Sequence, residues 1–290
     1  MGIISSIRHR NLLELQGWCY EKGEAMLVYK YMRNGSLDRY LYYGEKRGAL
    51  ESETRLRILA GVALALDYLH TGLWECVLHR DVKAANVLLT EKFEPMLADF
   101  GLARLVGHDQ GAVTMTAAGT PGYVAPEVVY AGKVTEKADV YGFGVLALEV
   151  ACCRPALHRA TRPEDNIDFR LVDWVWLLHQ GNQLMEALDP AMHVEPAQKQ
   201  HWKCVLHVAL MCCSPSPESR PSMRQVSQAL HGDTLLIMQP LPATRPLYPT
   251  ALTSLPSASA SSTSGTLATS ASQASANSTS TFGYPACLPR

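Results

Sequence analysis

Three short segments carry most of the residues that could do chemistry in this sequence. They are His79–Asn86 (HRDVKAAN), Asp99–Gly101 (DFG) and Ala125–Glu127 (APE). Each segment alone could arise by chance, but this order and these separations are typical of the set that builds a phosphotransfer site. Only 78 residues precede the first segment, which is too few for everything that such a site normally uses upstream.

Four side chains in these segments fit the needs of phosphoryl transfer, which requires an aligned nucleophile and neutralisation of the developing charge. Asp81 suits the base that accepts the proton of a substrate hydroxyl, and Lys83 can reach the transferring phosphate. Asn86 and Asp99 offer hard oxygen ligands, which suit Mg²⁺ or Mn²⁺ rather than zinc. A single Asp or Asn in a loop usually caps a turn or a helix, but four such residues in register favour catalysis.

The bulk composition indicates an ordinary globular chain. Its 290 residues are 47% apolar and carry a net charge of −1, which allows one large domain or two small ones. A charge balance this near to neutral gives no reason to expect nucleic acid as a partner. The eight cysteines form no C-x-x-C pair, so we expect buried thiols in a reducing cytosol rather than a zinc ribbon or a redox motif.

The sequence shows no segment typical of a membrane span or a secretory signal. Its longest apolar run, Val140–Cys153, is too short for a span and contains Glu149. We therefore expect the chain as written to be cytoplasmic. One pattern, Met1–Ser6, fits the acceptor for N-myristoylation at Gly2, although its isoleucines also fit the apolar face of a helix end. A single acyl chain would anchor the protein only marginally.

A change in composition near Pro240 divides the chain. Beyond it only Arg245 and Arg290 are charged, and Ser, Thr, Ala and Pro dominate. Such a segment cannot bury enough apolar surface to offset the entropy that is lost on ordering. We expect one domain over residues 1–239, followed by a disordered tail over residues 240–290. The proline-rich start of the tail fits either a solvated linker or a ligand in the polyproline conformation.

Hydrophobic periodicity predicts a few strands early in the chain and helices later, which indicates an α+β domain with a mostly helical body. The first two strands are joined by the polar turn Glu21–Glu24, and Ser36 is expected to cap a short helix that begins at Leu37. The predicted strands are Gly17–Tyr20, Ala25–Tyr31, Val87–Leu89 and Met96–Ala98. The predicted helices are Glu53–His70, Thr135–Cys153, Asp173–Leu178, Gln198–Cys213 and Ser222–Leu230.

From residue 1 to about 232 the sequence resembles a eukaryotic protein kinase, mainly its larger C-terminal lobe. Within that family it is similar to plant receptor-like serine/threonine kinases, and we favour the legume-lectin branch. The segments that carry this closer resemblance are Gly17-Trp18-Cys19, Leu27-Val28-Tyr29, Asn34-Gly35-Ser36-Leu37 and Leu171-Val172-Asp173-Trp174-Val175-Trp176. The resemblance implies a protein-kinase-like α+β fold with a mostly helical C-lobe and only a remnant of the N-lobe sheet.

The same resemblance implies an activity and its cofactors. Phosphate would pass from ATP, with Mg²⁺ or Mn²⁺, to a hydroxyl of a protein substrate. Lys83 and Thr120 favour Ser and Thr over Tyr as the acceptor. The resemblance also assigns an ATP pocket: Tyr29 would lie at its back, the backbone of Lys30 and Met32 would face the adenine edge, and Leu88 would form the floor. Ordinary core or strand positions remain an alternative for these four residues.

Several other residues take structural roles by resemblance. Asp139 would hold the backbone of the catalytic loop, and Glu127 would pair with Arg220. A column of stacked side chains that aligns the site would contain His79, Phe100, Ile4 and Leu15. The residues expected to be structural are His79, Phe100, Gly101, Glu127, Asp139 and Arg220.

Arg80 is expected, by resemblance, to pair with a phosphorylated residue of the activation segment, which follows the DFG motif. Thr120 would instead bond Asp81 and Lys83 in the loop that docks the substrate. An inert solvated loop remains an alternative around Thr114 and Thr116. The candidate phosphosites are Thr114, Thr116 and Thr120.

Two parts of a kinase nucleotide site are absent before Asp81. The sequence there has neither the G-x-G-x-x-G spacing nor a V-A-I-K-like segment. Lys22 and Lys30 cannot replace the phosphate-pairing lysine because both belong to the early hairpin. By resemblance, Met1 stands directly after the glutamate that would pair with that lysine.

Two interpretations of this absence remain open. In the first, the chain is an incomplete gene model of a receptor kinase that has an ectodomain and a membrane span, so that this part lies at the cytoplasmic face of the plasma membrane. In the second, it is a genuine short protein, a pseudokinase-like scaffold that binds partners without transferring phosphate. Either way we expect poor nucleotide binding as written, and exposed apolar surface at Leu13, Leu15 and Leu27.

Overall fold

The computed structural model describes residues 7–42, 46–107, 113–114, 118–158, 169–232 and 240–246. Most of the expected tail, from residue 247 onward, lies outside the described residues, as do Gly2, Ile4 and Thr116.

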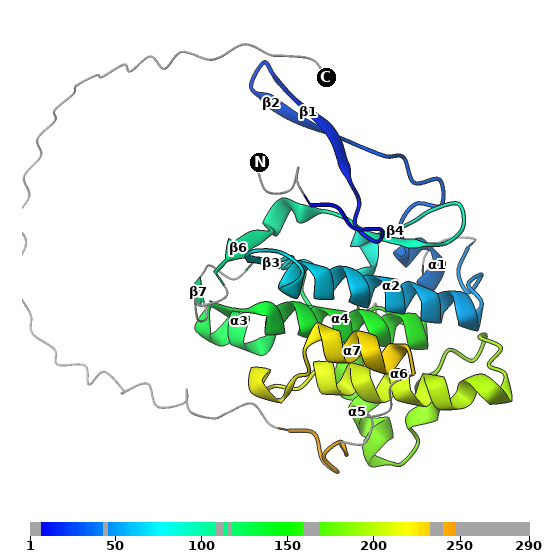
Figure 1. The fold of residues 1–290 in the computed structure, drawn as a ribbon. Coiled ribbons are helices and arrows are strands. Elements are labelled where there is room, and N and C mark those ends of the chain that lie inside the picture. The colour runs from blue at the N-terminus through cyan, green and yellow to red at the C-terminus, as the bar shows by residue number, and fades with distance from the viewer. Residues whose placement is uncertain are drawn as a thin grey trace, which may run out of the picture. The chain divides into compact units, whose positions relative to one another are not determined.

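Helices form the main body of the described chain (Figure 1). Helix α4 lies at its centre and packs against α2, α5 and α6, while α7 packs against α2 and α6. Every residue of α4 from Asp139 to Cys152 is buried, which explains why its sequence is apolar on all sides. The helices are α1 (Asp38–Leu41), α2 (Ser52–Thr71), α3 (Pro126–Ala131), α4 (Glu136–Cys152), α5 (Leu171–Gln180), α6 (Lys199–Cys212) and α7 (Met223–Leu230).

The helix ends follow local chemistry. Thr135 caps α4 by accepting a hydrogen bond from the Lys137 amide at 3.2 Å, and the helix ends at Cys153 in the left-handed conformation. Ser222 and Gln225 form a capping box at the start of α7. The expected Ser36 cap of α1 is wrong, because no side chain caps that helix and Ser36 instead forms a β-bridge with Leu88.

The strands pair only two at a time in the described residues, and all pairs are antiparallel. Two of these pairs position the site: residues 79–86 connect β3 to β4, and Asp99 follows β5. The pairs are β1 (Leu15–Glu21) with β2 (Glu24–Tyr29), β3 (Cys76–Leu78) with β6 (Arg104–Val106), β4 (Val87–Leu89) with β5 (Pro95–Leu97), β7 (Val113–Thr114) with β8 (Lys133–Val134), and β9 (Leu157–His158) with β10 (Phe169–Arg170).

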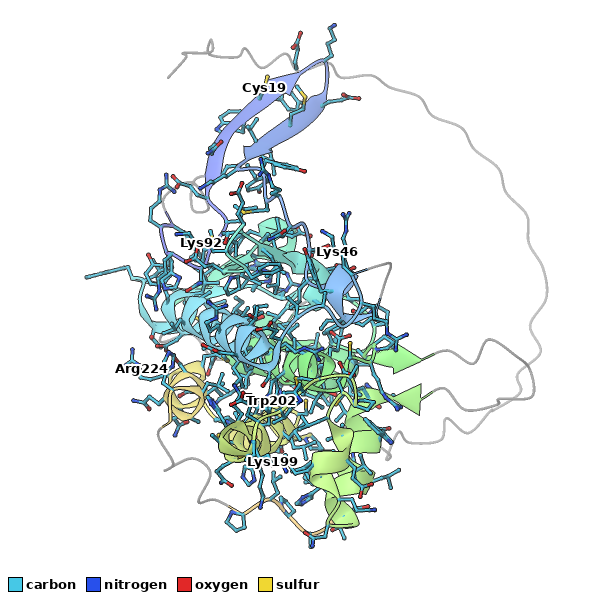
Figure 2. The ribbon with its side chains drawn as sticks, turned by 90° about the vertical axis from the view of Figure 1, so that its right-hand side faces the viewer. Cys19, Lys46, Lys92, Lys199, Trp202 and Arg224 are labelled. Carbon is cyan, nitrogen blue, oxygen red and sulfur yellow. The ribbon has the colours of Figure 1, made fainter. Side chains whose placement is uncertain are left out.

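The β1–β2 hairpin extends away from the helical body, as the positions of Cys19 and Trp202 in Figure 2 show. Leu27 is 47% exposed, as expected, but Leu13 and Leu15 are only 5% and 9% exposed. The prediction that Leu13 and Leu15 would be exposed is therefore wrong. The physical reason is that Leu13 lies beside β5, where its amide donates a 2.8 Å hydrogen bond to the Leu97 carbonyl.

None of the helices in the described part of the chain combines the length and the apolar character of a membrane span.

Candidate active site

Asp81 lies at the centre of a compact set of polar contacts. The ammonium of Lys83 lies 2.6 Å from Asp81 Oδ2, and the hydroxyl of Thr120 donates to Asp81 Oδ1 at 2.7 Å. Lys83 also donates to Thr120 Oγ1 at 2.8 Å, so the three side chains close a triangle. The expected contacts of Thr120 with the catalytic loop are therefore present. Asp81 and Lys83, the two partners of Thr120, lie 39 and 37 residues before it in the sequence.

The surroundings of Asp81 keep its carboxylate ionised. Burial by itself would raise the pKa of Asp81, but hydrogen bonds from Lys83, Thr120 and Asn86, together with the charge of Lys83, lower this pKa below its ordinary value. Asn86 Nδ2 contributes two bonds, to the Asp81 carbonyl at 2.9 Å and to Oδ2 at 3.0 Å. An ionised carboxylate held in this way can orient a hydroxyl and accept its proton.

The backbone of the catalytic loop is held by Asp139 at the first turn of α4. Its carboxylate accepts the amide of His79 at 2.8 Å and the amide of Arg80 at 2.7 Å. His70, near the end of α2, lies 3.0 Å from the same carboxylate. Burial favours a higher pKa for Asp139, but its interactions with His70 and His79 lower the pKa overall. Arg80 has a positive φ of 71°, so this anchoring offsets local backbone strain.

His79 connects the catalytic loop to the DFG segment. Its Nε2 lies 3.0 Å from the Ala98 carbonyl, and its Nδ1 accepts the amide of Asp81 at 3.4 Å. This arrangement needs a neutral ring with the proton on Nε2. Burial lowers the pKa of His79, which also favours the neutral ring. The ring centroids of His79 and Phe100 lie 5.1 Å apart, so two members of the expected column are in contact.

Asn86 and Asp99 offer oxygen atoms of the kind that Mg²⁺ takes. Asn86 uses its amide nitrogen for Asp81, and its carbonyl oxygen accepts no hydrogen bond from the residues that the structure describes. Asp99 is exposed and sits in the left-handed region at φ 64°, with Oδ1 accepting the amide of Gly101 at 3.2 Å. No group of three His, Cys, Asp or Glu side chains within the described ranges could hold a metal ion. One carboxylate, one amide oxygen and the substrate phosphates fit Mg²⁺, which usually keeps few protein ligands.

The residues assigned to the adenine pocket come together beside the DFG segment. Tyr29, Leu88 and Met96 pack around a small apolar cluster, which contains Leu13, Met32 and Ala98. Burial and the nearby charge of Asp99 raise the pKa of the Tyr29 hydroxyl, so the end of β2 lies close to the DFG aspartate. Lys30 has an exposed side chain beside this cluster.

Arg80 points toward the start of the activation segment. Its guanidinium donates to the Leu102 carbonyl at 3.2 Å, and burial and the like charge of Arg104 lower its pKa. Two neighbouring guanidinium groups typically bind a phosphate through charge-assisted hydrogen bonds. Thr114 lies in β7, where its backbone pairs with Lys133, and its side chain is outside the described structure.

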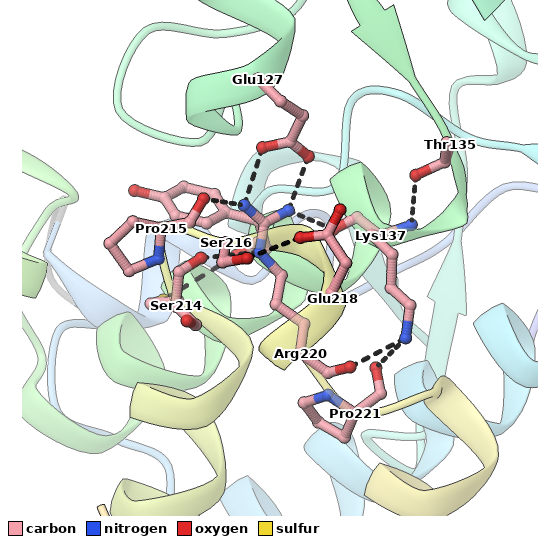
Figure 3. Close-up of polar contacts among 11 residues, drawn as sticks. Glu127, Thr135, Lys137, Ser214, Pro215, Ser216, Glu218, Arg220 and Pro221 are labelled. Atoms are coloured by element: carbon pink, nitrogen blue, oxygen red, sulfur yellow. Dashed lines mark hydrogen bonds and ion pairs between the residues drawn. The ribbon is translucent and has the colours of Figure 1, made fainter. Parts of the chain in front are cut away.

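The expected ion pair between Arg220 and Glu127 is present and buried (Figure 3). The two guanidinium nitrogens Nη1 and Nη2 each lie 2.7 Å from a different oxygen of Glu127. Arg220 also donates to the carbonyls of Ser214, Lys137 and Pro215, at 2.7, 2.8 and 3.2 Å. This pair therefore ties the APE segment to the loop before α7.

A second buried network was not predicted from the sequence. Glu149, inside α4, accepts hydrogen bonds from the hydroxyls of Tyr123 and Tyr42 and from the amide of Ala156. Burial raises the pKa of Glu149 to about 7 despite these bonds. Tyr123 follows Thr120 by three residues, so Glu149 holds the loop that carries Thr120. A lone acidic residue within an apolar helix was the available signal, because a buried carboxyl needs partners.

Comparison with known proteins places these features in a family. A family model described as the protein kinase domain matches residues 1–231. Over 248 residues the chain is 44% identical to the probable L-type lectin-domain containing receptor kinase S.7 of Arabidopsis thaliana, which covers 85% of this chain and 36% of that protein. Over 245 residues it is 42% identical to the L-type lectin-domain containing receptor kinase SIT2 of Oryza sativa subsp. japonica, with 84% and 35% covered.

The chain thus spans about a third of the length of the curated relatives that it matches. Among solved structures, the pseudokinase domain of BIR2, described as an immune regulator of the RLK/Pelle family, is similar with a TM-score of 0.66. That comparison has 32% sequence identity and covers 79% of this chain and 67% of the other. The mostly helical body with small sheets is accordingly a protein kinase fold, as the sequence predicted.

Proposed function

The chain belongs to the protein kinase family, and we propose that it carries the phosphotransfer site of a receptor-like serine/threonine kinase. Similarity to plant L-type lectin receptor kinases supports this assignment. The substrates would be ATP and a Ser or Thr hydroxyl of another protein. We also propose that the kinase domain ends near residue 239, and that in a longer receptor it would lie at the cytoplasmic face of the plasma membrane.

The triangle of Asp81, Lys83 and Thr120 is the observation that carries this proposal. In this triangle, Asp81 accepts the proton of the substrate hydroxyl as the hydroxyl oxygen attacks the γ-phosphorus; the bond from that phosphorus to the bridging oxygen breaks, and ADP leaves. Lys83 stays close enough to Asp81, at 2.6 Å, to place positive charge beside the transferring group. Thr120 restrains the orientation of the carboxylate by donating to its Oδ1.

Asn86 and Asp99 are proposed to hold the metal through the Asn86 carbonyl oxygen and the Asp99 carboxylate. Bound Mg-ATP would supply the phosphoryl group and spread the negative charge that develops on it. Tyr29, Met32 and Leu88 would surround the adenine, with the backbone of Lys30 and Met32 facing its edge; their packing beside the DFG segment supports this placement.

Arg80 is proposed to order the activation segment by pairing with a phosphorylated threonine. The nearby guanidinium of Arg104 supports this role, because a phosphate there would relieve the repulsion between the two cations. Thr114 and Thr116 are the candidate phosphosites.

A transfer assay with radiolabelled ATP tests the catalytic proposal. Labelling of the 290-residue chain itself or of a basic protein substrate, reduced at least 100-fold in Asp81→Asn, would support catalysis, since the substitution removes the proton acceptor. Asp67→Asn makes the same change on α2, at a partly buried carboxylate whose contacts are Thr71 and Arg224 rather than the catalytic loop, and as the matched control it should keep wild-type labelling. Equal labelling by the wild type and Asp81→Asn, at background, would exclude catalysis by this chain.

A second candidate function is that of a non-catalytic interaction module, akin to a pseudokinase. The similarity to the BIR2 pseudokinase domain favours it. A measurement of the melting temperature with and without Mg-ATP distinguishes the two functions. A nucleotide-binding site should raise the melting temperature by several degrees at saturating Mg-ATP, and Asp99→Asn should reduce this shift. No shift in the wild type, together with background labelling, would favour the scaffold.

A further inference from the structure

Residues 240–246 contact helix α5 although four of the seven, Pro240 and residues 242–244, are exposed (orange beside α5 in Figure 1). Three different contacts hold this segment. Leu241 is one of the partly buried side chains that pack on the main apolar core. His179 Nε2 lies 3.2 Å from the Pro242 carbonyl, and Arg245 Nη1 lies 2.7 Å from Asp173 Oδ1. An apolar contact, a hydrogen bond and an ion pair thus share one short segment.

The spacing of these contacts fits the dimensions of the two partners. Asp173 and His179 are six residues apart on a helix, which corresponds to about 9 Å along its axis. Pro242 and Arg245 are three residues apart, and an extended chain of that length spans about 10 Å. The segment therefore runs antiparallel to α5, with its proline at the last turn of the helix and its arginine at the first.

The outer face of α5 has a chemistry that suits this occupant. The buried side of the helix anchors it in the body, through residues such as Val175 and Trp176. The two partly exposed groups that contact the segment are the acid of Asp173, in the first turn, and the imidazole of His179, in the last turn, where its ring packs against that of Trp176 with centroids 5.4 Å apart. Trp174, next to Asp173 in sequence, is partly exposed as well. Trp174 already carries the guanidinium of Arg154, 4.2 Å from its ring centroid. Such a face favours a segment that combines an apolar side chain, a free carbonyl and a cation.

We propose that the α5 docking face, defined by Asp173 and His179, recognises short segments of the pattern Leu-Pro-x-x-Arg. In this chain the occupant is its own segment Leu241–Arg245, bound in cis. A partner protein that carries the same pattern would bind in trans by displacing it. This inference does not depend on phosphoryl transfer.

The cis occupant is displaceable because its ion pair with α5 is weak. The ion pair is partly exposed, with 27% of the Arg245 side chain and 39% of the Asp173 side chain accessible, and pairs of this kind contribute little by themselves. The segment is instead kept at the face by its covalent connection to α7, through residues 233–239, which gives a high effective concentration. Prolines at 240, 242 and 246 also limit the entropy that is lost on binding.

Binding of a fluorescein-labelled peptide of residues 240–246 (PLPATRP) to the full chain tests this proposal. Arg245→Glu should release the cis segment and raise the affinity for the peptide at least fivefold over the wild type. Adding Asp173→Arg to Arg245→Glu should abolish the gain, because the swapped pair re-forms in cis and the face no longer attracts an arginine. Arg224→Glu makes the same charge change on α7 and should behave as the wild type.

A charge-swapped peptide (PLPATEP) completes the design. It should bind the Asp173→Arg chain more tightly than the wild type, because the altered face now attracts a glutamate and repels the native Arg245. Equal binding of PLPATRP to the wild type and to Arg245→Glu, or no binding to Arg245→Glu, would overturn the docking face. Failure of the swapped peptide to prefer Asp173→Arg would show that the ion pair does not contribute to recognition.

Discussion

The catalytic loop, residues 79–86, is surrounded by partners, whereas the β1–β2 hairpin is held mainly by its own strand pairing. His79 is fully buried and the Asp139 carboxylate accepts two amides of the loop. In the hairpin, by contrast, Trp18 and Tyr20 are more than half exposed, at 60% and 57%. Both regions fall within the same family match.

This difference shows which part of the molecule sets the geometry of the site. The backbone amides of His79 and Arg80 are paired by Asp139 of α4, and the ring of His79 by the Ala98 carbonyl, because an unpaired polar group in the interior is costly. The hairpin contributes Tyr29 at its end but few buried contacts along its length. We therefore expect the loop to keep its shape when the hairpin is perturbed, and to lose it when α4 or its neighbours are perturbed.

Breaking the ion pair between Arg220 and Glu127 should have the largest effect. Arg220→Ala leaves a buried carboxylate and three carbonyls without their donor, so we expect the free energy of unfolding in urea to fall by about 3–5 kcal/mol. Glu127→Ala should cost less, because Arg220 keeps its carbonyl acceptors. A loss below about 1 kcal/mol for Arg220→Ala would show that the body is less tightly held than its contacts suggest.

Glu149 should make the stability of the body depend on pH. The pKa of Glu149 is about 7 in the folded chain, above the ordinary value of 4.5. Between pH 4.5 and 7 the folded chain therefore binds a proton at Glu149 that the unfolded chain has lost. Raising the pH through this window ionises a buried carboxyl, and the free energy of unfolding should fall by up to about 3 kcal/mol. Below pH 4.5 this contribution is fully present, and above about 7 it is lost.

Urea titrations at about pH 5 and about pH 8 measure this dependence. Glu149→Gln stays neutral and should flatten it, whereas the exposed Glu186→Gln should not. Identical pH dependence in the wild type and Glu149→Gln would contradict the assignment.

Asp139→Asn tests the anchor of the catalytic loop itself. One amide acceptor replaces two carboxylate oxygens, so the amide of His79 or that of Arg80 loses its partner. We expect a destabilisation of about 1–3 kcal/mol and faster hydrogen exchange at these two amides. Unchanged exchange would mean that the loop does not depend on α4.

The smallest effect should come from the hairpin. Leu27→Ala removes a side chain that is 47% exposed, and we expect a change in the free energy of unfolding below about 1 kcal/mol. Leu13→Ala is the matched truncation at a position 5% exposed and should cost about 2–5 kcal/mol. Similar losses for the two leucines would remove the contrast between hairpin and body.

Most helices and strands, and the residues of the catalytic loop and the DFG segment, could be predicted from the sequence because periodicity and motif spacing are local properties. The strands 87–89 and 15–29 and the long helices lie where the patterns predicted, within a few residues. Helix α3 was missed because six residues carry too little periodicity. The pairing of β3 with β6 was missed as well, since neither short strand shows an alternating pattern.

Contacts between distant segments were harder to predict. The burial of Leu13 depends on Leu97, and the partners of Glu149 lie on separate loops, so no local pattern encodes either. The pair of Glu127 with Arg220 was expected only through the family resemblance. Ser36 was misassigned because its capping preference competes with a backbone bridge to Leu88, which the sequence does not reveal.

Native-state hydrogen exchange of the wild-type chain tests most directly whether the helical body sets the site. The amides of His79 and Arg80, which donate to Asp139, should exchange at least about 100-fold more slowly than the amides of Leu27 and Val28 in β2. The loop amides should open only with the body as a whole, while the hairpin amides open locally. Equal protection of the two regions, or faster exchange in the catalytic loop, would contradict this account.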